Sequence, residues 1–401
     1  MTRGLMKSTS CFAIAAAAGL FATSAMAADL GGNCCADLEE RVAELEATAA
    51  RKGNRKVSLT VYGQVNQALF WHDSDEADAY RSDSVTIRDN GANMSRFGFR
   101  GEAQIRPDLT AGYVIEIGLS NVDLGMTGDN LTIRHNYAYI DSKTFGRVSL
   151  GQTSQVTDGL YEINLANAQK VPGVSNEESA FMGGRYAATF ADNIDGARKQ
   201  GVYYRTPSLA GFVLSAGFSH DTDDGADDSN DYWEVALRYA GEFNGIRVAA
   251  GIGYRKMEDN TSAVWVADQE VILGSASVMH TPTGLFVSGG YASVDTNHAF
   301  DAGAKDSFWV MAGIEKNWFG YGNTTLFGEY GEIDYDNNVS TSIRNRVVTL
   351  DGNYWGLGVT QSIDAAATDL YLNFRQYELE DGQVFAGDDA SVIAAGMLIK
   401  F

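Results

Sequence analysis

The sequence predicts an all-β fold, a closed 16-stranded antiparallel transmembrane β-barrel. Many segments alternate apolar and polar residues with a period of two, as strands with one apolar and one wet face do. The connections between these segments alternate between short turns and long polar loops. The 401 residues include 44 Gly, 19 Phe, 19 Tyr and only 4 Pro, a composition that suits a barrel with a polar lumen.

Residues 1–27 are predicted to be a signal peptide. Arg3 and Lys7 give a positively charged start, residues 11–23 are mostly apolar, and Ala25-Met26-Ala27 offers a small-residue cleavage site. The apolar run is too short to anchor the chain as a membrane-spanning helix. Cleavage would remove two positive charges and change the formal net charge from −22 to −24. So acidic a chain is not expected to bind nucleic acid.

Residues 28–56 are predicted to form a periplasmic stub. A short coiled-coil helix is expected over 36–50, because apolar residues recur there at spacings of four, three and four: Leu38, Val42, Leu45 and Ala49. Two heptads do not hold an oligomer by themselves, so the helix either joins a parallel oligomeric stub or lies on the protein's own surface. Residues 51–56 predict a polar hinge. Cys34 and Cys35 could pair with each other, link neighbouring subunits or remain free.

The barrel domain is predicted to span residues 57–401, since the period changes from helical to two at Val57. Sixteen strands are expected, near residues 57–71, 95–106, 109–119, 132–141, 146–153, 200–206, 211–219, 231–240, 246–257, 268–280, 284–294, 306–317, 322–333, 351–362, 368–379 and 390–401.

Short and long connections alternate strictly along the barrel domain. Residues 106–108 and 281–283 are examples of the short turns, whereas 72–94 and 335–350 are long and polar. Every strand therefore reverses direction, and all short turns lie at one end. Outer-membrane barrels have short periplasmic turns and long outer loops, so both termini are expected in the periplasm.

The apolar face of each strand is predicted to face lipid. Trp233, Val235 and Leu237 share one face, and Glu234 and Arg238 share the other. Sixteen strands enclose a lumen too wide for side chains to fill. The apolar faces must therefore look outward, and the charged faces line water.

The run Ser95-Arg96-Phe97-Gly98-Phe99-Arg100-Gly101-Glu102, followed by Gln104-Ile105 and Asp108-Leu109-Thr110, has a specific likeness. It resembles the second and third strands of the general bacterial porins of Gram-negative outer membranes. Val61-Tyr62-Gly63 and Tyr203-Tyr204-Arg205-Thr206-Pro207 resemble porin segments in the same order. The stub resembles an extension of some alphaproteobacterial porins, and Phe401 resembles the signal read by the β-barrel assembly machinery.

This resemblance implies a homotrimer of water-filled channels for passive diffusion of ions and small hydrophilic solutes, without a cofactor. Outer-membrane lipid and lipopolysaccharide are the implied surroundings. The third loop of the family folds inward and narrows the pore; here the third long connection runs from Gln152 to about Gln200. The alternative is that this connection contains a further hairpin near residues 184–190.

The resemblance also implies the residues of the pore constriction. The basic candidates lie on lumen faces and are Arg96, Arg134, Arg198 and Arg100. The acidic candidates lie in the third connection and are Asp158, Glu162, Glu177 and Glu178. Alternatively, these side chains are ordinary solvated lumen charges or anchor the loop. Gln64 stands where general porins often carry a basic residue, so a modest cation preference is expected.

Three other functions remain open. The barrel could be a substrate-selective channel, an outer-membrane enzyme, or a structural or adhesive protein tethered through the stub. An enzyme is not predicted, because the chain lacks a Gly-x-Ser-x-Gly motif and its five histidines are scattered without a metal-ligand or triad pattern.

Overall fold

The computed structural model describes residues 57–74, 83–119, 131–168, 189–190, 194–221, 230–258, 268–297, 303–336, 351–379 and 389–401. The predicted signal peptide and stub, with Cys34 and Cys35, lie outside the described residues, as do Glu177 and Glu178. No helix in the described part of the chain is long and apolar enough to cross a membrane.

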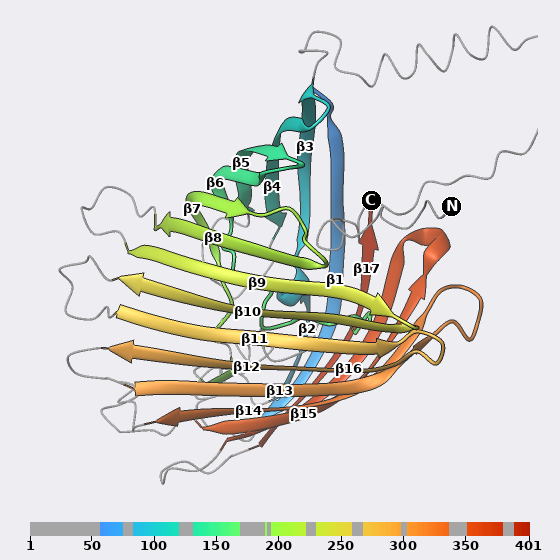
Figure 1. Ribbon diagram of the computed structural model, residues 1–401. Helices are drawn as coiled ribbons and strands as arrows, with labels where there is room; N and C mark the ends of the chain where they lie inside the picture. The colour runs from blue at the N-terminus through green and yellow to red at the C-terminus, as the bar shows by residue number, and fades with distance from the viewer. Residues whose placement is uncertain are drawn as a thin grey trace, which may run out of the picture.

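Antiparallel strands make up nearly all of the described structure (Figure 1). They are β1 (Thr60–Ser74), β2 (Asp83–Asp89), β3 (Ser95–Arg106), β4 (Leu109–Leu119), β5 (Leu131–Ser142), β6 (Gly146–Ser154), β7 (Arg198–Arg205), β8 (Phe212–His220), β9 (Asp231–Phe243), β10 (Ile246–Glu258), β11 (Asp268–His280), β12 (Leu285–Asn297), β13 (Gly303–Lys316), β14 (Thr324–Asp336), β15 (Gly352–Ile363), β16 (Thr368–Leu379) and β17 (Asp389–Lys400).

The sheet closes into a barrel through β1. From β3 onward each strand pairs with its neighbour in sequence, and β1 pairs with β17 on one side and with β2 and β3 on the other. Because β2 and β3 share one position in the wall, the seventeen strands form a closed 16-stranded barrel. Closure leaves no unpaired sheet edge, as a β-structure in lipid requires. The predicted fold class is confirmed.

Strand β2 was not predicted, since residues 72–94 were expected to be a loop. Val85 and Ile87 of this strand are outward residues, with 60% and 77% of their surface exposed. Two apolar residues are too few to reveal a period of two, and a 3-10 turn at Gly91–Asn93 separates them from β3. Pairing with β1 stabilises the strand, and this pairing cannot be recognised from the sequence of β2 alone.

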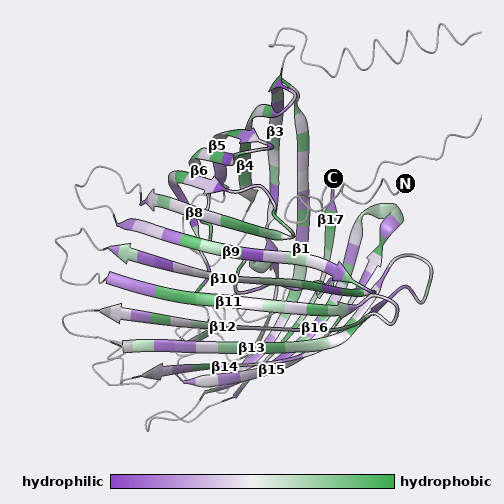
Figure 2. Cartoon of the chain, viewed as in Figure 1, coloured by the Kyte–Doolittle hydropathy of each residue, from purple (hydrophilic) through white to green (hydrophobic). Residues whose placement is uncertain are grey.

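The outward position of the apolar faces is confirmed. Val61, Val65 and Leu69 of β1 are 57%, 45% and 41% exposed, whereas Gln64 and Asn66 between them are buried in the barrel. Figure 2 shows the same alternation of hydrophobic and hydrophilic residues along other strands. The exposed side chains therefore form the surface that lipid covers.

The short turns follow from local chemistry. Asn244 and Gly245 join β9 to β10 with positive φ angles of 50° and 80°, and Phe243 pairs directly with Ile246. An Asn-Gly pair with two positive φ angles makes the two-residue turn whose twist matches the flanking strands. This turn therefore sets the register of the hairpin.

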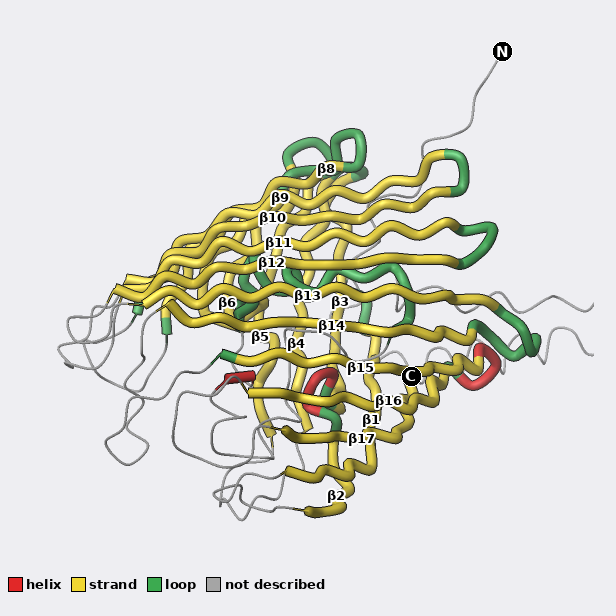
Figure 3. The backbone as a smooth tube through the Cα atoms, turned by 90° about the horizontal axis from the view of Figure 1, so that it is seen from below, coloured by secondary structure: helices red, strands yellow, loops and turns green. Residues whose placement is uncertain are grey.

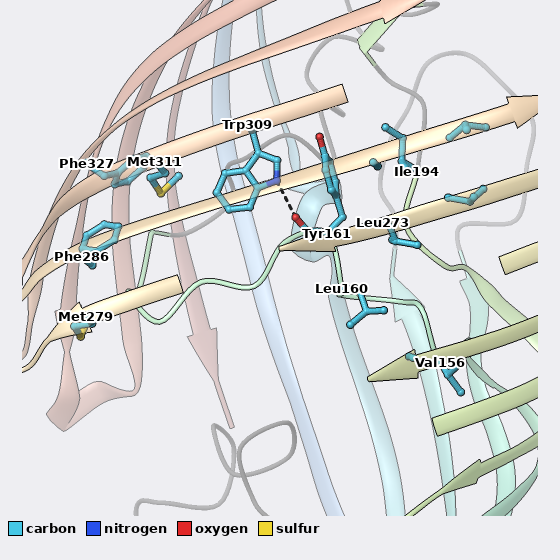
Figure 4. Close-up of a cluster of buried hydrophobic side chains, with 14 of the residues drawn as sticks. Val156, Leu160, Tyr161, Ile194, Leu273, Met279, Phe286, Trp309, Met311 and Phe327 are labelled. Carbon is cyan, nitrogen blue, oxygen red and sulfur yellow. Dashed lines mark hydrogen bonds between the residues drawn. The ribbon is translucent and has the colours of Figure 1, made fainter. Parts of the chain in front are cut away.

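The third long connection folds into the barrel, as predicted. Its residues 155–168, which we call the inner segment, include Leu160 and Tyr161, both completely buried. The Tyr161 ring packs edge-on against Trp309 of β13 at 6.3 Å, and Trp309 Nε1 donates a hydrogen bond of 2.8 Å to the Tyr161 carbonyl oxygen (Figure 4). The inner segment thus packs against the lumen side of the wall.

Candidate functional site: the pore constriction

Three of the predicted arginines lie on the lumen side of one part of the wall. Arg96 is on β3, Arg134 on β5 and Arg198 on β7. Glu116 of β4 lies between the first two, with its Oε1 2.8 Å from Arg134 Nε and 3.8 Å from Arg96 Nε. The alternation of β4 places Glu116 in the lumen, but its position between these arginines was not predicted.

A β-bulge brings Arg134 to this position. Glu116 pairs with His135, but the next residue, Ile117, pairs with Ile133, so Arg134 is an extra residue in β5. A bulge breaks the alternation of faces and re-aims side chains. Both Arg134 and His135 consequently approach Glu116, and His135 Nε2 lies 3.8 Å from its Oε1. A strict period of two would have placed only one of them in the lumen.

Arg198 connects the basic wall with the inner segment. Its Nη2 lies 4.0 Å from Oδ2 of Asp158, one of the predicted acidic residues. Glu162 follows in the same segment and is exposed. The contact of Arg198 with Asp158 places one arginine of the wall beside one carboxylate of the inner segment.

Arg100 lies apart from this cluster. Its guanidinium group is centred 5.4 Å from the ring of Tyr62 on β1, a distance at which the positive charge and the ring attract each other. Phe401 lies at the end of the wall and exchanges two backbone hydrogen bonds with Gly63, of 2.9 and 3.0 Å. The C-terminal residue thus helps to close β17 onto β1.

Buried polar groups hold the beginning of the inner segment. Arg238 of β9 donates hydrogen bonds to the carbonyl oxygens of Val156 (2.9 Å) and Asp158 (2.6 Å). The Glu234 carboxylate accepts from the backbone nitrogen and hydroxyl of Thr157 at 3.1 and 3.0 Å. These bonds satisfy buried groups of both partners, so they fix the backbone that carries Asp158.

Asp195 joins the two ends of the third connection. Its carboxylate is 3% exposed and accepts hydrogen bonds from the backbone nitrogens of Gly159 (3.1 Å) and Tyr161 (3.2 Å). Burial raises the pKa of Asp195, and the nearby carboxylates of Glu162 and Asp158 raise it further. No local sequence pattern indicates Asp195, because its partners lie more than thirty residues earlier in the chain.

Serines of the opposite wall hold the rest of the inner segment. Ser275 and Ser277 of β11 accept hydrogen bonds of 2.9 and 3.0 Å from the backbone nitrogens of Ile163 and Leu165. The Tyr161 hydroxyl lies 2.6 Å from the Ser307 hydroxyl on β13. Small polar side chains let the segment lie close to the wall while they satisfy its backbone.

In this part of the lumen, arginines of the wall lie near the carboxylates of Glu116 and of Asp158 in the inner segment. Positive and negative side chains that face each other produce a transverse electric field, and rings of charge in a pore discriminate between ions. Among the described residues, no group of three His, Cys, Asp or Glu side chains is arranged to hold a metal ion. The arrangement suits the passage of small polar solutes.

Solved structures of bacterial outer-membrane proteins share the barrel fold of this chain. The anion-selective porin of Comamonas acidovorans is similar with a TM-score of 0.62 at 20% identity, covering 86% of this chain and 100% of its own. OmpF of Salmonella typhi is similar with a TM-score of 0.57 at 16% identity, covering 86% and 98%. The outer-membrane channel DcaP of Acinetobacter baumannii gives 0.56 at 13% identity, covering 87% and 99%.

The sequence itself gives the family. A family model for Gram-negative porins matches residues 13–317, most of the chain. The chain belongs to the Gram-negative porin family, and it is an outer-membrane channel for passive diffusion. No curated protein matches the sequence.

Proposed function

We propose that Arg96, Arg134 and Arg198 form the basic side of the pore constriction and that Asp158 and Glu162 form its acidic side. The observation that carries this proposal is the 4.0 Å approach of Arg198 to Asp158, which joins the arginine cluster to the inner segment. Glu116 is added to the acidic groups, since it lies between two of the arginines.

The constriction is then nearly balanced in charge, with three arginines and three carboxylates. The acidic chain, with a formal net charge of −22, draws cations toward the mouth, although salt screens this attraction beyond about 8 Å. Selection is therefore made where the side chains lie close together. We propose a modest preference for cations over anions.

Reversal potentials in a salt gradient across a planar bilayer test these roles. The double substitution of Asp158→Asn and Glu162→Gln is expected to lower the cation preference. The double substitution of Arg96→Ser and Arg134→Ser is expected to raise it and to increase the conductance, because two long side chains are removed. Unchanged reversal potentials in both variants would show that the constriction lies elsewhere.

The channel is proposed to work as a homotrimer without enzymatic activity. The absence of enzymatic activity would be contradicted if the purified protein hydrolysed lipid or peptide and a substitution in the barrel abolished this hydrolysis. A substrate-selective channel would instead admit one solute much faster than others of equal size and charge. Liposome swelling with a series of neutral sugars distinguishes this case from general diffusion.

A further inference from the structure

The wall position shared by β2 and β3 contains an insertion. Gln67 of β1 pairs with Asp89 at the end of β2, whereas Gln64 pairs with Arg96 near the start of β3. Gln64 and Gln67 are three positions apart in β1, whereas their partners Arg96 and Asp89 are seven positions apart. The partner side therefore contains four additional residues. These are Gly91–Met94, because the backbone nitrogen of Asn90 still donates to the Asn66 carbonyl oxygen at 3.1 Å. We call Asn90–Met94 the seam turn.

The seam turn lies on the lumen side of the wall. Gln64 Nε2 donates hydrogen bonds to the carbonyl oxygens of Asn93 (2.9 Å) and Met94 (3.0 Å), and Asn66 Nδ2 donates to that of Asn93 at 2.9 Å. Gln64 and Asn66 both point into the barrel, and Asn66 is completely buried. The short helical turn can be followed beside β1 inside the barrel in Figure 3.

The seam turn extends well beyond β1. At one end, Asn90 Nδ2 donates to the Tyr371 hydroxyl of β16 at 2.9 Å, and this hydroxyl donates to Asn66 Oδ1 at 2.9 Å. At the other end, the Met94 sulfur lies 2.9 Å from the position that a Cβ atom on Gly118 of β4 would occupy. The absence of a side chain at Gly118 therefore leaves room for Met94.

The two inward elements meet on β16. Asn167 of the inner segment donates from Nδ2 to Asp369 Oδ1 at 2.9 Å, and Asp369 is two residues from Tyr371, which holds the seam turn. The inner segment also contacts β11 and β13, and the seam turn reaches β4. Together they contact β1, β4, β11, β13 and β16, and Arg96, Arg134 and Arg198 lie along the part of the wall between β3 and β7.

Asn93 connects the seam turn with the charged site. Its Oδ1 accepts one hydrogen bond from Arg96 Nη2 at 3.1 Å and another from Gln64 Nε2 at 2.7 Å. The bond to Asn93, with a longer one of 3.5 Å from Arg96 Nη2 to Gln64 Oε1, holds the arginine while its Nε remains 3.8 Å from Glu116. Gln64 occupies the expected place of a basic residue. Its hydrogen bonds instead hold the seam turn against β1.

We propose that the seam turn is a second constriction element, which narrows the pore by its bulk and sets ion selectivity through Asn93 as the positioning residue of Arg96. The proposal rests on the constriction proposed above. Without Asn93, Arg96 would turn toward Glu116, so less positive charge would face the lumen.

Deletion of Gly91–Met94 tests whether the bulk of the seam turn narrows the pore. Because four residues are removed, each side chain of β3 keeps its face, and the register of β1 with β2 continues into β3. The single-channel conductance in a planar bilayer is expected to rise. Assembly is checked by heat-modifiable mobility on a gel. If the deletion does not assemble, the double substitution of Asn93→Ala and Met94→Ala reduces the bulk with the backbone intact, and the same rise is expected.

Asn93→Ala tests the positioning of Arg96. The substitution removes only the side-chain acceptor and keeps the carbonyl oxygen that Gln64 and Asn66 reach. The reversal potential is expected to shift toward higher cation preference, in the direction of Arg96→Ser but by a smaller amount. Asn373→Ala, at another lumen position on β16, is the matched control and is expected to leave the reversal potential unchanged.

The outcomes separate this proposal from the one on which it rests. An unchanged conductance in the assembled bulk variants would refute the narrowing role, and an unchanged reversal potential in Asn93→Ala would refute the positioning role. If Arg96→Ser and Arg134→Ser still shift the reversal potential, the charged constriction stands and only the seam turn is wrong. If no variant has an effect, both proposals fail.

Discussion

Glu116 lies between Arg96 and Arg134, and its negative charge offsets part of the positive charge on this part of the wall. The lumen positions of Arg96 and Glu116 could be predicted, because alternation assigns a face to each strand residue. The contact of Arg134 and His135 with Glu116 could not, since it depends on a bulge. The contacts of Asp195 could not be predicted either, because its partners come close only when the third connection folds inward.

Glu116→Gln is expected to lower the cation preference of the channel. The substitution keeps the shape of the side chain but removes a negative charge next to two arginines, so the wall becomes more positive. The measurement is the reversal potential in a salt gradient. Glu242→Gln serves as the matched control, since Glu242 pairs with Arg247 near a short turn, away from the arginine cluster. Equal shifts in the two variants would mean that the effect is not local to the constriction.

At the scale of elements, the short turns and all strands except β2 could be predicted, because local sequence patterns determine them. The Asn244-Gly245 turn and the alternation of β9 and β10 are examples, and their pairing follows from both. The path of the inner segment is different, because its bonds go to Ser275, Trp309 and other wall residues more than a hundred positions later in the sequence. The sequence indicates that this connection is long, whereas the structure shows which strands of the wall it contacts.

Trp309→Phe is expected to loosen the inner segment without disrupting the barrel. Phenylalanine keeps most of the packing against Tyr161 but loses the hydrogen bond to its carbonyl oxygen, a loss of about 1 kcal/mol. More frequent current fluctuations are expected in single-channel recordings. Trp355→Phe is the matched control, because Trp355 is 41% exposed on the outer face. If the current fluctuates equally rarely in both variants, the hydrogen bond from Trp309 does not stabilise the inner segment.

At the scale of the whole molecule, the closed barrel needs no other subunit to satisfy its backbone, since β17 pairs with β1. A trimer would therefore be held by contacts between outer faces rather than by shared strands. The predicted coiled-coil helix, over residues 36–50, would contribute little beside such contacts because it is only about two heptads long.

The proposed trimer is tested by electrophoresis of unheated detergent extracts. The protein is expected to run at about three times the monomer mass, and planar bilayers are expected to show conductance steps in groups of three. Deletion of residues 36–50 is expected to leave the trimer intact. A monomer produced by this deletion would show that the stub, rather than the barrel wall, holds the subunits together.

Removal of Phe401 is expected to reduce the amount of folded barrel in the outer membrane. The proposed reasons are the loss of its two backbone bonds to Gly63 and the loss of the assembly signal. Heat-modifiable mobility measures the folded fraction. Phe401→Tyr keeps an aromatic ring and both backbone bonds and is the control, so an equal loss in this variant would contradict a general aromatic signal.

The pairing of the last strand with the first has a consequence for biogenesis. Gln64 pairs with Lys400, a separation of 336 residues, so the ladder between them cannot form until almost the entire chain has been synthesised. Contacts so distant in sequence make folding slow. Until then, the free sides of β1 and β17 expose unpaired backbone groups that could join another chain. A chain truncated before β17 is therefore expected to remain an open sheet with a free edge on β1.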